Sequence, residues 1–160
     1  MKKHMENKEL DRIDKRIIEA LAVAPVIRAV SERIGKAEAL AILQEVNEKE
    51  AFRCGQNMRD EKSPNGIEEL INEVAAWGDG EMWKMDVLEQ TPTTYFFNVT
   101  RCPYYEKYLE LGLEEFGMEL SCCRDKYFAR GFNPNLRLVR KKTIMDGFDY
   151  CDFQYYLEGP

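Results

Sequence analysis

The sequence predicts a single α+β domain over residues 1–160, with N-terminal helices packed on a C-terminal four-stranded antiparallel sheet. Up to Gly80 the apolar residues recur at spacings of three and four, which is the helical period. After Gly80 the chain contains runs rich in aromatic and β-branched residues. Of all the aromatic residues, only Phe52 and Trp77 precede Gly80. We therefore expect a helical part over 1–80 and an α+β part over 81–160, in the order β-β-α-α-β-β.

Three helices are expected in the first part. The first has apolar residues at helical spacing until Pro25 interrupts or kinks it: Leu10, Ile13, Ile17 and Leu21. A second helix follows Gly35, with Leu40, Leu43 and Val46 on one face. The turn "EKSPNG" at 61–66 leads into a third, short amphipathic helix from Ile67 to Trp77.

Two hairpins and two helices are expected in the second part. The runs 82–89 and 94–101 are β-prone and joined by "TPT", which predicts the first hairpin. Helices are expected in "YYEKYLELGLEEFG" and in "MELSCCRDKYFARGF". The runs 136–143 and 149–157 flank "MDGFD", which predicts a second hairpin with a glycine turn.

Composition narrows the classes of function. The formal charge is −6, and no basic face or tail stands out, which argues against a nucleic-acid or anionic-membrane partner. The N-terminal lysines are followed by no apolar segment, and no run approaches a membrane span, so we expect a cytoplasmic protein. Five cysteines in a chain of this size indicate reduced thiols rather than a disulfide framework.

Cys102 follows a strand-like run and precedes Pro103, where a helix is expected to begin. With Thr100 as the N-cap, Cys102 would lie in the first helical turn, where free N–H groups and the helix dipole favour an anion. Arg101 is a neighbouring cation, so we expect a partly ionised thiol that iodoacetamide labels before Cys54. The alternative is that Cys102 packs as a small apolar residue.

Further thiols and carboxylates follow Cys102 along the chain. Cys122 and Cys123 lie in an expected helix, and Asp125 follows Cys122 by about one turn, which places both on one face. Cys151 and Asp152 are adjacent in the last strand and must point to opposite sides of the sheet. We expect Cys102, Cys122 or Cys123, and Cys151 to share a pocket.

Most standard catalytic motifs are absent from the sequence. The only histidine is His4, and there is no Walker loop, Gly-x-Gly-x-x-Gly or Cys-x-x-Cys pair. No cofactor is therefore expected. A zinc ion or another metal bound by the thiolates of Cys102, Cys122 or Cys123, and Cys151 is the alternative, although their spacing is not that of a standard site.

About the last 60 residues resemble the L-2-amino-thiazoline-4-carboxylic acid hydrolase family. The shared features are Thr-Arg-Cys-Pro at 100–103, the pair Cys122 and Asp125, Asn133-Pro134, and the ending from Gly147 to Cys151-Asp152-Phe153. The helical first half contains no recognised motif.

The resemblance implies a hydrolase that opens a small cyclic amidine-like substrate, such as 2-aminothiazoline-4-carboxylate, to an N-carbamoyl amino acid. Such a reaction needs a nucleophile, a proton donor and a cation for the substrate carboxylate. The catalytic candidates are Cys102, Asp125, Asp152, Cys122 and Cys151, and the substrate-binding candidates are Thr100, Arg101, Asn133 and Arg140, with Arg124 as a further possible clamp.

Some of these residues could instead have a purely structural role. Asp125 could form only a surface ion pair, and Arg140 could belong to the solvated run "RKK". The alternative function is a noncatalytic domain that senses a small molecule or a metal.

Overall fold

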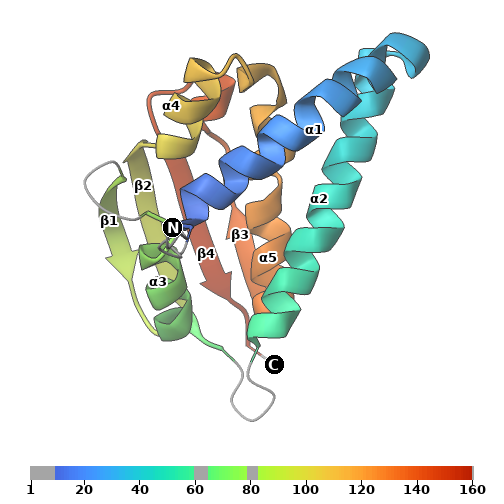
Figure 1. Cartoon of the computed structure of the whole chain (residues 1–160). Helices are drawn as coiled ribbons and strands as arrows, with labels where there is room; N and C mark the ends of the chain where they lie inside the picture. Colours follow the sequence, from blue (N-terminus) through green and yellow to red (C-terminus); the bar gives the residue numbers. More distant parts are fainter. Residues whose placement is uncertain (1–9, 60–64, 79–82, 160) are drawn as a thin grey trace, which may run out of the picture.

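The computed structural model describes residues 10–59, 65–78 and 83–159, and it combines one antiparallel sheet with helices (Figure 1). The predicted α+β class is confirmed. Three helices come first: α1 (Arg12–Ile34), α2 (Lys36–Met58) and α3 (Ile67–Ala75). The sheet consists of β1 (Lys84–Gln90), β2 (Thr94–Arg101), β3 (Leu136–Val139) and β4 (Cys151–Leu157), in the order β1-β2-β4-β3.

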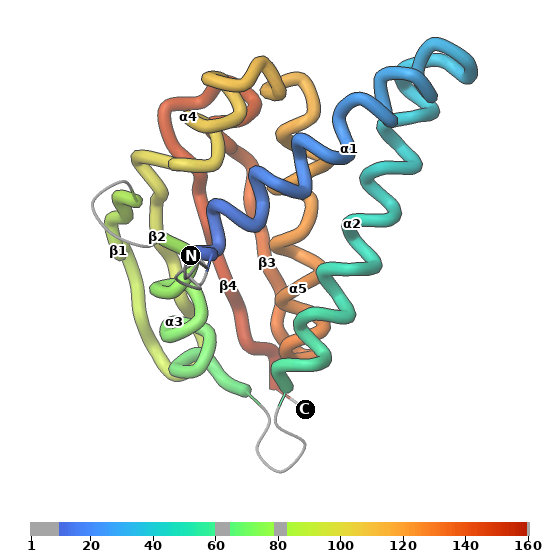
Figure 2. Tube along the Cα trace, viewed as in Figure 1, coloured from blue at the N-terminus to red at the C-terminus, as the bar shows by residue number. Residues whose placement is uncertain are grey.

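Helices α1 and α2 form a long antiparallel hairpin that turns at Gly35, whose φ of 93° suits glycine (Figure 2). Helix α1 continues through Pro25 without a break. Three alanines of the two helices, Ala20, Ala24 and Ala39, are buried in one cluster together with the larger Ile27 and Leu43. The prediction of which residues face inward is therefore partly wrong, because Leu10, Leu21 and Val46 are exposed. In the described residues, no helix has the length and apolar character needed to cross a membrane.

The first hairpin and α3 agree with the prediction. Thr91 N donates to Thr94 O at 2.9 Å and closes the turn between β1 and β2. Met82, the first residue of the predicted strand, lies outside the described residues. Helix α3 buries Ile67, Leu70 and Val74 against the sheet.

The second hairpin differs from the prediction of strands over 136–143 and 149–157. Strand β3 ends at Val139, and a longer connection containing the turn η3 (Ile144–Asp146) leads to β4. Two side chains explain the early end. Asp152 Oδ1 accepts the N–H groups of Lys141 and Lys142, which would otherwise bond within the sheet, and Arg140 turns towards Asp125.

The second helical region is also more irregular than predicted. Helix α4 (Pro103–Glu110) is followed by a short turn, η1 (Glu114–Phe116), by a π-helical turn, η2 (Met118–Cys122), and by α5 (Arg124–Phe132). Cys123 N donates to Met118 O at 2.9 Å across the π turn. Such turns often occur at functional sites.

Two glycines bring α5 into backbone contact with α2. A Cβ atom built on Gly55 would lie 2.3 Å from Phe128 O, and one built on Gly131 would lie 2.1 Å from Phe52 O. Side chains larger than glycine would therefore push the helices apart. This contact fixes the C-terminal half of α5 against α2, and Arg124 and Asp125 begin the same helix.

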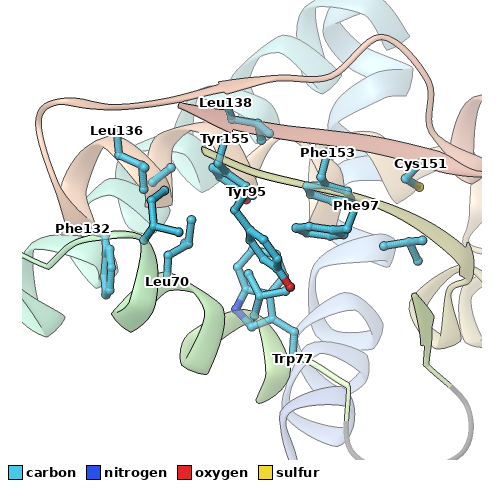
Figure 3. Close-up of a cluster of buried hydrophobic side chains, with 14 residues drawn as sticks. Leu70, Trp77, Tyr95, Phe97, Phe132, Leu136, Leu138, Cys151, Phe153 and Tyr155 are labelled. Atoms are coloured by element: carbon cyan, nitrogen blue, oxygen red, sulfur yellow. The ribbon is translucent and has the colours of Figure 1, made fainter. Parts of the chain in front are cut away.

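Aromatic residues fill the core between the sheet and the helices (Figure 3). The rings of Phe97 and Phe153 stack with centroids 4.8 Å apart. Tyr95 and Tyr155 extend the row along β2 and β4, and Trp77 packs on Phe153. Cys151 lies at one end of this cluster, where the aromatic core meets a pocket.

Candidate functional site

A pocket of about 360 Å³ lies between the inner face of the sheet and the surrounding helices. Val99 and Phe153 from the sheet line it, together with Trp77, Trp83 and Phe128, so much of its wall is apolar. Charged groups come from α1, α3, α5 and the end of β3: Arg12, Lys15, Arg16, Glu19, Glu73, Arg124, Asp125 and Arg140. An apolar enclosure with a few charged groups is the usual form of a small-molecule site.

Three thiols that are distant in sequence line this pocket. Cys102 comes from the junction of β2 and α4, Cys122 from the π turn, and Cys151 from the start of β4. Their charges and that of Asp125 are close enough to influence one another. Cys123 is not among the lining residues, and its Sγ donates to Glu119 O at 3.1 Å. Cys151 Sγ accepts the N–H of Ile144 at 3.2 Å.

Cys102 is not the partly ionised thiol that the sequence predicts. Cys102 itself is the N-cap of α4, with Pro103 as the first helical residue, whereas Thr100 is still in β2. Burial raises the pKa of Cys102 to about 11, and the backbone N–H groups of Tyr105 and Tyr104 oppose this only in part. The helix start favours the thiolate, as expected, but its effect is smaller than the cost of burial. Burial likewise raises the pKa of Cys122 and of Cys151.

Asp125 and Arg140 form an ion pair in the pocket wall. Arg140 Nη1 donates to Asp125 Oδ2 at 2.5 Å, and Arg140 Nη2 donates to Cys122 O at 2.7 Å. The guanidinium also lies 4.8 Å above the ring of Phe153. Arg140 is therefore not part of a solvated run, and both of its terminal nitrogens donate to groups of the protein. No donor among the described residues reaches Asp125 Oδ1, which leaves that oxygen for a ligand or water.

Ionisation of this pair is set by two opposing effects. Burial raises the pKa of Asp125, and the charge and hydrogen bond of Arg140 only partly offset it. Burial alone would lower the pKa of Arg140, but Asp125 and Cys122 outweigh it and raise that pKa. A carboxylate whose pKa is raised accepts a proton more readily than an ordinary aspartate, which suits a general base.

Four candidates lie outside the pocket, and each has a structural reason. Thr100 is exposed on β2, and Arg101 forms a fork with Glu106 through bonds of 2.7 and 3.1 Å. Asp152 is held by two backbone N–H groups on the other side of β4. Asn133 is buried, where its Nδ2 donates to Asn65 O at 2.7 Å and holds a loop.

Helix α1 contributes charged residues to the pocket that are not among the candidates predicted from the sequence. Arg12 and Arg16 line the pocket and pair with Glu73 and Glu19 at 2.6 and 2.5 Å. Their spacing with Lys15 and Glu19 puts all four on one helical face, so a charged stripe on an otherwise apolar helix was the available signal. Cys54 of α2 was also missed; it is exposed and lines the pocket.

The alternative of a metal held by the thiols concerns the arrangement of the possible ligand side chains. In the described ranges, no group of three or more His, Cys, Asp or Glu side chains is arranged to hold a metal ion. His4 lies outside those ranges.

Comparison with known proteins gives one match. A family model described as L-2-amino-thiazoline-4-carboxylic acid hydrolase matches residues 15–155. The matched range includes most of α1 and all of α2 as well as the C-terminal residues that carried the resemblance. No curated protein and no solved structure matches the chain.

Proposed function

The chain belongs to the L-2-amino-thiazoline-4-carboxylic acid hydrolase family, and from this premise we propose that it opens small cyclic amidine-like rings, such as that of 2-aminothiazoline-4-carboxylate, by hydrolysis. The single observation that carries the proposal is Asp125, a pocket carboxylate held by Arg140 on one oxygen and open on the other. The substrate is a small molecule, which suits a pocket of about 360 Å³.

Water is the nucleophile in this proposal, because the pocket thiols are protonated at neutral pH. With a pKa of about 11, Cys102 is ionised at only about one part in 10⁴ at pH 7. Asp125 Oδ1 accepts a proton from water, and the water oxygen bonds to the ring carbon of the C=N group. The proton passes from Asp125 to the ring nitrogen, giving a tetrahedral intermediate.

Collapse of the intermediate opens the ring. The carbon–sulfur bond breaks, a C=O bond forms, and Asp125 carries the hydroxyl proton to the departing sulfur. One water is consumed, Asp125 returns to its starting state, and the product is an N-carbamoyl amino acid with a free thiol. Although the electrophile is the carbon of a C=N group, the bond that opens the ring is therefore carbon–sulfur. Arg140 keeps Asp125 oriented throughout.

The test is incubation of the full chain with L-2-amino-thiazoline-4-carboxylate in ¹⁸O-labelled water, with and without a chelator. We expect N-carbamoyl-cysteine carrying one ¹⁸O atom, detected by mass spectrometry, and loss of the activity in Asp125→Asn but not in Asp86→Asn, an exposed matched control on β1. Unchanged activity in Asp125→Asn would remove Asp125 from the mechanism. Loss of the activity in the presence of the chelator would instead support a metal ion bound by the thiolates.

The second candidate is a domain that binds a small molecule without converting it. The protonated state of all three pocket thiols favours this reading, because it removes the most reactive nucleophiles from the pocket. Saturable binding of the thiazoline with no product would support it over the hydrolase.

A further inference from the structure

Arg124 differs from the other arginines of the pocket because it forms no ion pair with a carboxylate of the residues that the structure describes. Arg12, Arg16 and Arg140 each form an ion pair with an acidic residue. Among the described residues, the only acceptor of Arg124 is Asn47 Oδ1, which its Nη1 reaches at 2.9 Å. Yet Arg124 is only 9% exposed, so its charge lies in a poorly solvated place.

An uncompensated buried cation is costly to the folded state. Burial, followed by the charge of Arg16, lowers the pKa of Arg124, and the charge of Glu19 opposes this shift only in part. An arginine nevertheless keeps its proton at neutral pH. The pocket therefore contains a fixed positive charge that an anionic ligand can neutralise.

Asn47 holds this arginine without neutralising it. Asn47 Nδ2 donates to Glu119 O at 2.9 Å, which turns its Oδ1 towards the guanidinium. The remaining N–H groups of Arg124 are left for another acceptor, and a planar fork of such donors matches the two oxygens of a carboxylate. A neutral amide at position 47 thus orients the guanidinium and preserves its charge.

We infer that Arg124, oriented by Asn47, binds the carboxylate of the ligand and makes the pocket selective for small heterocyclic carboxylates. The inference rests on the proposed function for the identity of the ring, and it assigns the carboxylate clamp to a residue on α5. Arg124 and Asp125 both line the pocket, and the charge of Arg124 is close enough to act on the pKa of Asp125, so a ligand bound at one residue lies near the other. Arg101, the clamp favoured from sequence, is instead occupied by Glu106 outside the pocket.

The first experiment measures binding without turnover. L-thiazolidine-4-carboxylate lacks the C=N group and cannot be opened by the proposed reaction, and thiazolidine lacks the carboxylate as well. Ligand-observed NMR titration of the full chain should show binding of the carboxylate and much weaker binding of thiazolidine. Arg124→Gln should weaken binding of the carboxylate by about 100-fold, the usual scale for losing charge-assisted bonds, and should leave thiazolidine unaffected. The matched control Arg101→Gln should bind both ligands as the parent does.

A second variant separates anion binding from a structural role of Arg124. Asn47→Asp places a carboxylate beside the guanidinium and neutralises it within the chain. We expect loss of binding of the carboxylate with a melting temperature within a few degrees of the parent. If Arg124 were needed only for folding, the Asn47→Asp variant would bind the carboxylate as well as the parent does. That result would overturn the inference.

Outcomes of the two proposals are distinguishable. Turnover of the thiazoline with KM unchanged in Arg124→Gln and in Asn47→Asp keeps the hydrolase and rejects the clamp. Arg124-dependent binding of the carboxylate without turnover keeps the clamp and rejects the hydrolase. Failure of the parent to bind thiazolidine-4-carboxylate in preference to thiazolidine rejects the clamp.

Discussion

Two arginine–carboxylate pairs, one in the pocket and one on the outside, show what distinguishes the candidate site from the rest of the molecule. The hydrogen bonds are alike: 2.5 Å from Arg140 to Asp125 and 2.7 Å from Arg101 to Glu106. Solvent exposure is not, because the side chains are 11% and 22% exposed in the pocket but 40% and 33% outside. The chemistry of each pair follows from its surroundings more than from its geometry.

The pKa values of the two carboxyl groups are shifted in opposite directions. The hydrogen bond from Arg101 lowers the pKa of Glu106, which water also solvates. Burial raises the pKa of Asp125 in spite of Arg140. The lowered pKa stabilises Glu106 as an anion, whereas the raised pKa of Asp125 makes its carboxylate the stronger proton acceptor of the two.

The largest effect is expected for Asp125→Asn. Removing the proton acceptor should lower kcat by about 10³-fold, within the range for a general acid–base group. The variant also leaves Arg140 buried without a counter-charge, so unfolding should be easier by about 2–4 kcal/mol. Steady-state kinetics and urea denaturation check the two effects, with Glu106→Gln as the exposed control. If Asp125→Asn kept more than a tenth of the parent activity, the buried pair would have no special role in catalysis.

Because its folded-state pKa is raised, the same carboxyl should produce an acid limb in the pH profile. Activity that depends on ionised Asp125 disappears as pH falls through that pKa, and the midpoint should lie above the value of about 3.9 for an ordinary aspartate. A kcat/KM profile of the parent tests this, and a flat profile down to pH 4 would contradict it.

The next largest effect is expected for Gly55→Ala, which breaks the wall that carries the pocket pair. A Cβ atom there would lie 2.3 Å from Phe128 O and 2.6 Å from Phe132 N, both backbone atoms that cannot move alone. Alanine gains about 1 kcal/mol in helix propensity, but the overlap costs about 1–3 kcal/mol or more. We expect net destabilisation in urea denaturation and displacement of Asp125. Gly159→Ala, which meets nothing within 4 Å, is the control, and an equal stability of the two variants would contradict the backbone contact.

Much of the fold could be predicted from the sequence because it depends on local patterns. Helical periodicity, the turns at Gly35 and "TPT", and the alternation in the last strand gave the α+β class and located most elements. The exposed faces of α1 and α2 were not predictable in this way. Periodicity identifies large apolar residues, whereas part of the buried surface of these helices consists of Ala20, Ala24 and Ala39, and Leu21 and Val46 remain exposed.

Site residues that belong to a sequence motif could be predicted, whereas properties that depend on packing between distant segments could not. Cys102, Cys122, Cys151 and Asp125 converge on one pocket. The pKa of a thiol, however, depends on how deeply other elements bury it, and no local pattern contains that information. For the same reason Arg101 was preferred to Arg124: neighbours in sequence do not show which arginine is buried without a carboxylate.

Thiol reactivity gives a smaller but sharper distinction between a buried and an exposed thiol of the pocket wall. Because its pKa is about 11, Cys102 should react slowly with iodoacetamide at pH 7, and its rate should rise about tenfold per pH unit towards pH 11. The exposed Cys54 should be labelled first. Peptide mass spectrometry after timed labelling measures both rates.

The corresponding substitution tests whether Cys102 attacks the substrate. Cys102→Ser should retain activity within about tenfold of the parent if water is the nucleophile, because serine keeps the size of the side chain and removes only the sulfur. Cys123→Ser, just outside the pocket, is the matched control. Complete loss of activity in Cys102→Ser alone would instead support a covalent route through this thiol.

The smallest effect is expected for Arg101→Gln, which breaks the exposed ion pair with Glu106. Arg101 lies at the end of β2, its only charged partner in the described residues is Glu106, and both side chains are open to solvent. Water and salt solvate the separated charges almost as well as the pair, so little stability is lost when the pair is broken. We expect Arg101→Gln to leave the melting temperature and kcat/KM unchanged. A double-mutant cycle of Arg101→Gln with Glu106→Gln should give no measurable coupling free energy. The cycle of Arg140→Gln with Asp125→Asn should, in contrast, give a measurable one. A fall in kcat/KM for Arg101→Gln at constant stability would move the carboxylate clamp back to the position favoured from sequence, and it would require the fork to Glu106 to open when substrate binds.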